Sequence, residues 1–225
     1  MFIVKYLLKK MALSSMLVVN RRGNKMMNSL ISAILQVMLF SVIPFIWWLC
    51  TARKKQPFLT WIGLQKPIIV HKGRYAMYIV LSIFTMLIPS FALVFFYIDR
   101  SLLAANQFAG LGAAAVIPAL FYAIIQTGLS EELLFRGFLL KRLMKIFDFQ
   151  VANLLQSIVF GCVHGAMLWS VLPLHVILLV VLTTALAGYV MGWVNERIAG
   201  GSIVTSWSIH SIVNFIAACL YMFKF

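Results

Sequence analysis

Two adjacent glutamates stand out in a chain with few acidic residues. The chain has five Asp and Glu residues in all, and Glu131 and Glu132 occur side by side. Arg136 follows Glu132 by four residues, the spacing at which two side chains meet on one face of a helix. Glu131 is rotated by roughly 100° from that pair and can point elsewhere. Taken alone, the segment also fits an ion pair at a membrane surface with one spare carboxylate.

Two further pairs show the same four-residue spacing inside apolar stretches. His164 follows Phe160, and Asn214 follows His210. Lipid offers no hydrogen-bond partner to such side chains, so they must face another helix or a cavity. A polar residue in a helical bundle is commonly a hydrogen-bonding partner of a neighbouring helix, and each pair by itself also fits that role.

A carboxylate, two imidazoles and an amide on different helices are together suited to hydrolysis. A carboxylate in an apolar pocket can act as a general base near neutral pH, which assigns Glu131 to the activation of water. His164 would share that water or accept its proton. His210 and Asn214 would donate hydrogen bonds to the oxyanion as it develops. The ion pair described above would fix the helix that carries the base.

Other hydrolytic designs are missing from the sequence. It contains no HExxH pattern for a zinc protease and no GxSG loop for a rhomboid-type serine protease. Asp99 and Asp148 lie at the edges of apolar runs, which excludes an aspartyl dyad. Cys162 and His164 are two residues apart and therefore on different faces of a helix. The Glu/His arrangement remains.

Composition identifies the environment of these residues. Of the 225 residues, 63% are hydrophobic and 11% charged, whereas a soluble domain is about half apolar and a quarter charged. We therefore expect an all-α, polytopic transmembrane bundle of about six to eight helices, because helices satisfy their own backbone groups in lipid. The 19 Lys and Arg residues against five Asp and Glu cluster between apolar runs. That pattern is typical of membrane orientation and anionic headgroups, not of nucleic-acid binding.

Six apolar runs are long enough to cross a bilayer. They cover residues 30–50, 76–98, 108–128, 151–170, 171–194 and 203–223. Between the third and fourth, residues 129–149 are helix-patterned, apolar on one side and charged on the other, which predicts a seventh, amphipathic helix.

This pattern divides the chain into three parts. Residues 1–28 are a basic segment that fits an interfacial helix or a re-entrant hairpin with the first span. Residues 29–107 hold the first two spans, and residues 108–225 form the expected catalytic core.

Loop charge predicts which ends of the helices face the cytoplasm. Residues 51–74 carry several basic residues and no acid, so we place them inside. Alternation then places residues 99–107 outside and residues 141–145 and 195–202 inside. It also places the basic segment 1–28 outside, against the same rule.

The three motifs in this order resemble the CPBP family of CAAX-protease and bacteriocin-processing intramembrane proteases, also called Abi. The family pattern is EExxxR, then FxxxH, then HxxxN or HxxxD, on successive transmembrane helices. In this chain the pattern is Glu131-Glu132…Arg136, Phe160…His164 and His210…Asn214. The resemblance covers residues 115–222, about half of the chain.

The resemblance implies an endopeptidase with its site open toward the cytoplasm. A small, strongly apolar and basic chain is typical of a bacterial protein, so we expect it in a bacterial cell membrane. The resemblance gives every motif residue a role in hydrolysis. Water activation falls to Glu131 and His164, and the oxyanion hole to His210 and Asn214. Glu132 and Arg136 would be structural support or secondary catalytic groups, and Phe160 a supporting residue. The implied partner is a peptide or protein substrate at the membrane, and bacterial members are linked to bacteriocin processing or self-immunity.

The family is often labelled as metalloproteases. Glu131, His164 and His210 would be the ligand set for zinc. Water activation by a glutamate needs no metal, and we favour a metal-free site.

Two other functions compete with proteolysis. A protein of the same fold could bind a peptide or receptor for immunity without cleaving it, although such a binder could lose motif residues that are all intact here. A proton-coupled transporter could use the same groups as a relay, but it should show paired broken helices or halves related by symmetry. The sequence shows neither.

Overall fold

The computed structural model describes residues 24–223, which form a bundle of helices without a β-strand. The helices on either side of a long central run are α2 (Asn24–Thr51), α3 (Phe58–Ile62), α4 (Lys72–Phe96), α8 (Phe149–Met167), α9 (Leu174–Trp193) and α10 (Val204–Met222). This architecture confirms the predicted all-α fold. Residues 1–23 of the predicted basic segment 1–28 lie outside the described residues, and its last five residues begin α2.

The central run, Gly112–Leu143, is one continuous helix. Its parts are η3 (Gly112–Ala115), α5 (Val116–Leu120), the π-helical η4 (Phe121–Leu129), α6 (Ser130–Glu132), the π-helical η5 (Leu133–Leu140) and α7 (Lys141–Leu143).

The prediction of two separate elements, a span at 108–128 and an amphipathic helix at 129–149, was wrong. Glu132 and Arg136 are fully buried, so the charged side of this segment faces neighbouring helices instead of water. Residue 108 itself lies before the run, in the short 3-10 turn η2 (Ala104–Phe108).

Five of the described helices are long and apolar enough to cross a membrane, namely α2, α4, the central run, α9 with its π-helical extension η6 (Val194–Ile198), and α10. The helix α8 is not among them, so the expectation of six such spans was wrong by one. Polar side chains of α8 are satisfied by α9, since Asn153 donates to the carbonyl of Tyr189 (2.9 Å) and Gln156 to that of Gly188 (3.0 Å). These inward-facing amides lower the hydropathy of α8 without exposing polar groups to lipid.

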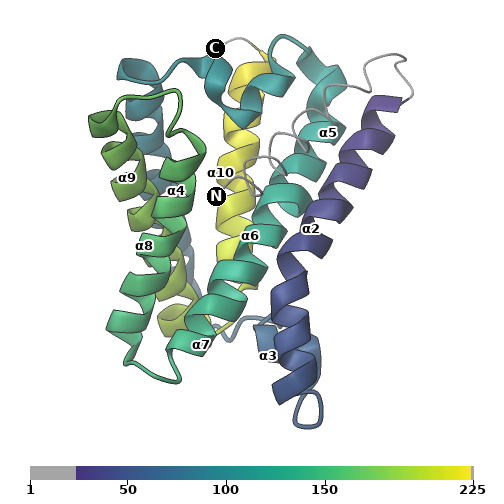
Figure 1. Cartoon of the computed structure of the whole chain (residues 1–225), viewed down its shortest axis with the longest axis vertical. Helices are drawn as coiled ribbons and strands as arrows, with labels where there is room; N and C mark the ends of the chain where they lie inside the picture. Colours follow the sequence, from purple (N-terminus) through teal and green to yellow (C-terminus); the bar gives the residue numbers. More distant parts are fainter. Residues whose placement is uncertain (1–23, 224–225) are drawn as a thin grey trace.

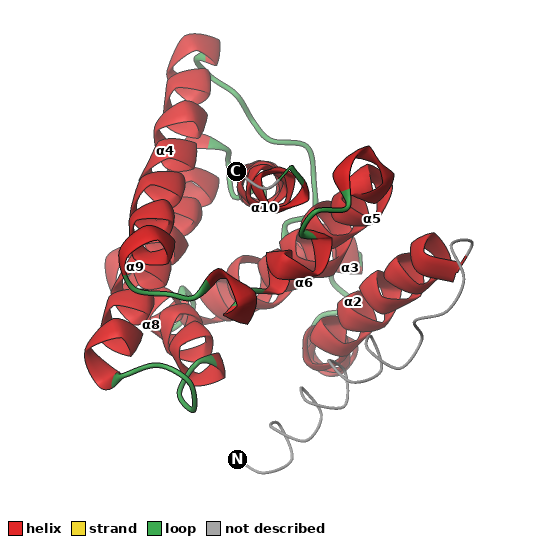
Figure 2. Cartoon of the chain, turned by 90° about the horizontal axis from the view of Figure 1, so that it is seen from above, coloured by secondary structure: helices red, strands yellow, loops and turns green. Residues whose placement is uncertain are grey.

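The helix α10 stands between the central run and the pair α4 and α9 (Figures 1 and 2). The helix α8 lies along α9, and α2 lies at the edge of the bundle beside α5 and α6. Close approach of α8 to α9 depends on Gly161, because a Cβ atom there would collide with the backbone oxygen of Val181. This contact sets the position of His164, one turn further along α8.

Three segments that alternation places on one side of the membrane meet at the lower end of the bundle in Figure 1. The N–H of Ile203 donates to the carbonyl of Gly63 in the basic loop 51–74 (2.9 Å). Nζ of Lys141, at the end of the central run, donates to the carbonyl of Gly201 (2.8 Å). Loop 51–74, α7 and the turn after η6 therefore share one end of the molecule.

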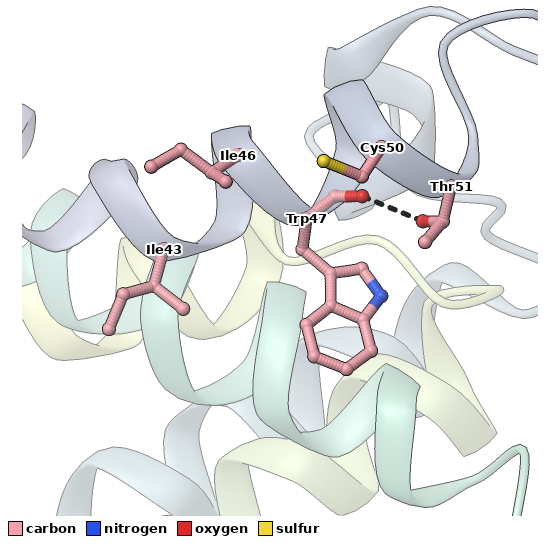
Figure 3. Close-up of a pocket in the computed structure, with 5 residues that line it drawn as sticks. All are labelled: Ile43, Ile46, Trp47, Cys50 and Thr51. Carbon is pink, nitrogen blue, oxygen red and sulfur yellow. Dashed lines mark hydrogen bonds between the residues drawn. The ribbon is translucent and has the colours of Figure 1, made fainter.

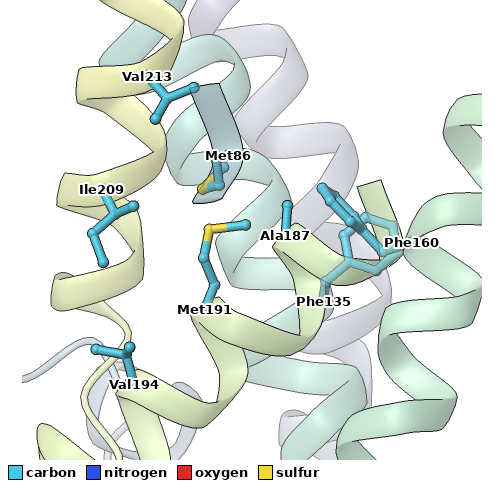
Figure 4. Packing of buried hydrophobic residues seen from close by; sticks show 8 residues of the cluster. All are labelled: Met86, Phe135, Phe160, Ala187, Met191, Val194, Ile209 and Val213. Atoms are coloured by element: carbon cyan, nitrogen blue, oxygen red, sulfur yellow. The ribbon is translucent and has the colours of Figure 1, made fainter. Parts of the chain in front are cut away.

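A cluster of buried apolar side chains joins this scaffold to the motif residues (Figure 4). Phe135 of the central run packs against Phe160 of α8, with 4.9 Å between ring centroids. Met191 of α9 and Ile209 of α10 are both fully buried in the same cluster. The core therefore ties together the three helices that carry the motifs.

A shallow apolar groove runs along the outer part of α2 (Figure 3). It is lined by Ile43, Ile46, Trp47, Cys50 and Thr51. The Thr51 hydroxyl donates to the carbonyl of Trp47 in the same helix (2.7 Å). No motif residue lines this groove, so it is separate from the candidate site.

Candidate active site

The two glutamates lie on α6, a single α-helical turn between two π-helical stretches of the central run. Stretches of π-helix are rare and occur frequently at functional sites. They free backbone carbonyls from the regular ladder, and the carbonyl of Ile124 in η4 accepts a hydrogen bond from the indole N–H of Trp207 in α10 (2.6 Å). This hydrogen bond joins the helix that carries the glutamates to the helix that carries His210.

Glu132 and Arg136 form the predicted ion pair. Nη1 of Arg136 lies 3.0 Å from Oε1 of Glu132, and both side chains are completely buried. The guanidinium also lies 4.2 Å above the centroid of the Phe160 ring. A buried charge pair needs further hydrogen bonds to offset desolvation. Glu132 has them, because its carboxylate also accepts from His210 and Ser206.

Glu132 makes a direct contact with a histidine that the sequence assigned to a different role. Nδ1 of His210 lies 3.0 Å from Oε1 of Glu132. An ionised carboxylate only accepts hydrogen bonds, so the Nδ1 atom is the one that donates. Glu132 therefore orients the His210 ring in addition to pairing with Arg136.

Glu131 points away from this pair, as its position on the helix predicts. Its Oε2 atom lies 3.7 Å from Nε2 of His210 and 3.9 Å from Nε2 of His164. The Glu131 side chain is 15% exposed. Its Oε2 atom is nevertheless buried and has no hydrogen-bond partner among residues 24–223. A buried polar atom of this kind requires an explanation, such as a water or ligand held at that place.

His164 sits at the more open side of this group, with 30% of its side chain exposed. Its Nδ1 atom lies 2.9 Å from the backbone oxygen of Phe160, one turn earlier in α8. The Phe160 ring lies under the imidazole, with 4.5 Å between centroids. The FxxxH spacing thus supplies both a hydrogen-bond acceptor and an aromatic support for the histidine.

Asn214 is bonded one helical turn away from this centre. Its Nδ2 atom donates to the hydroxyl of Thr127 (2.8 Å), which precedes Glu131 by four residues on the central run. The structure therefore brings Glu131, His164 and His210 together and joins Asn214 to the helix that carries Glu131.

Three polar residues of the site, Ser206, Asn195 and Thr127, lie outside the sequence motifs and were not predicted from them. Ser206 precedes His210 by four residues and lies on the same face of α10, so the i,i+4 spacing could have identified it. Thr127 has the same relation to Glu131. Asn195 lies on η6 and has no such relation to any motif, and only the folded chain places it next to Ser206 (2.7 Å from Nδ2 to Oγ).

The chemistry of the donor set suits zinc, but the spacing does not. Both histidines hold Nδ1 against an acceptor, as metal-ligating histidines commonly do. Ligands of one tetrahedral zinc stand about 3.3 Å apart, whereas the atoms here are separated by 3.7 and 3.9 Å. Within residues 24–223, no group of three or more His, Cys, Asp or Glu side chains is arranged to hold a metal ion. We derive no step through a metal.

A comparison with known families agrees with the motifs. Residues 113–216 match the family model described as type II CAAX prenyl endopeptidase Rce1-like. That stretch includes every motif residue. No curated protein and no solved structure is significantly similar to the chain. With five long apolar helices among the described residues, the chain is an integral membrane protein whose residues 113–216 are similar to the family of type II CAAX prenyl endopeptidases.

Proposed function

We propose that this protein hydrolyses a peptide bond of a membrane-associated or lipidated peptide with a water activated by glutamate and histidine. One observation carries the proposal. The buried Oε2 atom of Glu131 has no partner among the described residues and faces Nε2 of two histidines from two other helices. Separations of 3.7 and 3.9 Å exceed a direct hydrogen bond and leave room for one bridging water.

The hydrogen-bond partners of the two imidazoles support a base at this place. Nδ1 of His164 faces a backbone carbonyl and Nδ1 of His210 faces a carboxylate, and both partners only accept. A neutral His164 ring therefore carries its proton on Nδ1 and presents a lone pair on Nε2 toward Glu131, whereas a His210 ring protonated on both nitrogens donates from Nε2 toward the same place. A water between the two acceptors, Glu131 and His164, must donate its hydrogens to them, which increases the nucleophilicity of its oxygen.

In the proposed reaction the water oxygen attacks the scissile carbonyl carbon, and its proton passes to Glu131 or His164. The carbonyl oxygen becomes an oxyanion in the tetrahedral intermediate. His210 can donate to this oxyanion from Nε2 only when it is doubly protonated, and Glu131 and Glu132 flank it on both sides. Asn214 would supply a second donor. When the C–N bond breaks, the group that took the water proton, Glu131 or His164, gives it to the leaving amine.

The narrower biological roles rest on the resemblance. Because some members process bacteriocins, a bacteriocin precursor is one possible substrate class. The other role is self-immunity, conferred by this protein itself. The basic loop 51–74 at one end of the bundle supports a cytoplasmic location for that end in a bacterial membrane. We propose that the site opens to the same side.

Cleavage of a candidate peptide library in liposomes tests the proposal, with the wild type compared with Glu131→Gln in the presence and absence of a strong chelator. Activity that survives the chelator and disappears in the variant is the expected result. If the chelator also abolishes cleavage by the wild type, the result would favour a bound metal. If the wild type cleaves no peptide while it still binds one, the non-catalytic immunity protein becomes the better hypothesis.

A further inference from the structure

A buried polar pair outside the three motifs contacts Glu132. Ser206 of α10 and Asn195 of η6 are both completely buried. The backbone N–H of Ser206 donates to Oδ1 of Asn195 (3.0 Å), and Nδ2 of Asn195 lies 2.7 Å from Oγ of Ser206. The Ser206 hydroxyl in turn reaches Oε2 of Glu132. Three residues from three segments are thus joined by hydrogen bonds that end at the carboxylate that orients His210.

The backbone N–H of Ser206 determines the direction of this chain of hydrogen bonds. Because an N–H can only donate, the Asn195 atom that faces it must be the amide oxygen. The amide nitrogen therefore faces Oγ of Ser206 and donates to it. The hydroxyl proton of Ser206 is left for an acceptor, and the acceptors in reach are the Glu132 carboxylate and the carbonyl of Ile203 (3.2 Å).

The two oxygens of Glu132 are consequently held from both sides. Oε2 accepts from Ser206, while Oε1 accepts from Arg136 and from Nδ1 of His210. A carboxylate with donors on both oxygens cannot rotate without losing a bond to a charged group, which is stronger than a neutral hydrogen bond. The Ser206 hydroxyl is therefore one of three donors that hold Glu132 in the orientation in which it accepts the Nδ1 proton of His210.

We propose that Ser206, directed by Asn195, is a positioning residue that holds Glu132 and thereby fixes His210 with its Nε2 atom toward Glu131. The effect on catalysis rests on the proposed function, whereas the effect on the histidine ring does not. A purely structural role, in which the pair only attaches α10 to η6, would lower stability without changing the environment of the Nδ1 proton in protein that remains folded.

The chain offers a matched set of variants. Ser206→Ala removes the hydroxyl from a helix that tolerates alanine well, and Ser206→Thr restores a hydroxyl. Ser208→Ala is the control, because Ser208 is exposed and its hydroxyl bonds to the carbonyl of Val204 in its own helix (2.8 Å). Asn195→Ala is a second test variant in case Ser206→Ala does not fold.

The first measurement is solvent exchange of the His210 Nδ1 proton by NMR of the full chain, labelled with 15N in histidine rings, with His210→Gln used for assignment. Exchange should be roughly 10-fold to 100-fold faster in Ser206→Ala, as expected for loss of a hydrogen bond to a charged group. Ser206→Thr and Ser208→Ala should resemble the wild type. The proposal would be overturned if the Nδ1 proton exchanges at the wild-type rate in Ser206→Ala, or if Ser208→Ala accelerates the exchange equally. Either result counts whether or not any peptide is cleaved.

Peptide cleavage is the second measurement. Ser206→Ala should lower kcat by roughly 10-fold or more at unchanged KM, and Ser206→Thr should restore most of it. Altered exchange with unchanged kcat would refute the catalytic part of the proposal. If the wild type cleaves nothing and the exchange pattern is as expected, the proposed function fails while the positioning of His210 stands.

Discussion

Nδ1 of His210 lies 3.0 Å from Oε1 of Glu132, so the second glutamate of the EExxxR motif orients a histidine on another helix. Glu131 contributes its own carboxylate to the opposite nitrogen of the same ring, at 3.7 Å. The adjacent glutamates therefore differ in environment, since Glu132 is fully buried among donors, whereas Glu131 is partly exposed and its Oε2 atom has no hydrogen-bond partner in the described part of the chain. This difference separates the effects that we expect from their substitution.

Glu132→Ala should lower the free energy of unfolding by about 3–5 kcal/mol, because it leaves the buried Arg136 without its counter-charge. Glu131→Ala should have little effect on stability, since Glu131 makes no buried ion pair with an arginine or lysine among the described residues. Thermal unfolding of both variants in the same detergent checks the difference. Equal losses would show that the Glu132–Arg136 pair does not stabilise the fold as described.

Activity should follow the opposite order. Glu131→Ala should abolish peptide cleavage in protein that is still inserted and folded, because it removes the proposed base. Glu132→Ala should retain measurable peptide cleavage in the fraction of protein that stays folded, because the role of Glu132 is to orient His210. Cleavage rates normalised to folded protein decide the ranking, and the reverse order would exchange the roles of the two carboxylates.

Asn214→Ala should lower kcat by roughly 10²–10³ if the amide donates to the oxyanion. The hydrogen bond from Asn214 to Thr127 supplies a matched variant. Thr127→Val keeps the shape of the side chain and leaves the Asn214 amide in place, so it should reduce kcat less. A change confined to KM in Asn214→Ala would contradict the oxyanion role.

Gly161→Val should destabilise the protein and reduce activity together, because the added side chain collides with Val181 and separates α8 from α9. The displacement would move His164 away from Glu131. Gly73→Ala, in the first turn of α4, is the control, since the new Cβ would meet no atom of another described segment within 4 Å. It should be neutral or slightly stabilising. Retained activity in Gly161→Val would mean that α8 tolerates a wider separation.

Single cysteines at the two ends of the bundle test the proposed orientation. In a background without Cys50, Cys162 and Cys219, Lys54→Cys should react with an impermeant thiol reagent only after the cells are opened. Asn106→Cys, in the segment at the opposite end, should react in intact cells. The reverse labelling pattern would place the basic loop outside and contradict the charge rule for this chain.

Helices and their approximate bounds could be predicted from the sequence, because lipid requires long apolar segments with internally bonded backbones. The apolar stretches at 30–50, 76–98 and 203–223 correspond to α2, α4 and α10. The charged face of residues 129–149 led to the wrong prediction of a separate amphipathic helix. Hydropathy does not distinguish a polar face turned toward water from one turned toward the helices of the same protein.

The sequence by itself determined which residues could form the site, since the i,i+4 spacing places Glu132 with Arg136 and Phe160 with His164 on single helices. Contacts between helices were decided by the tertiary structure. In the folded chain His210 contacts both glutamates, and Asn214 donates a hydrogen bond to Thr127. Ser206 contacts Glu132 from the other side and is itself bonded to Asn195. The physical reason is that helical periodicity fixes neighbours within one helix, whereas neighbours on different helices depend on close packing such as that at Gly161.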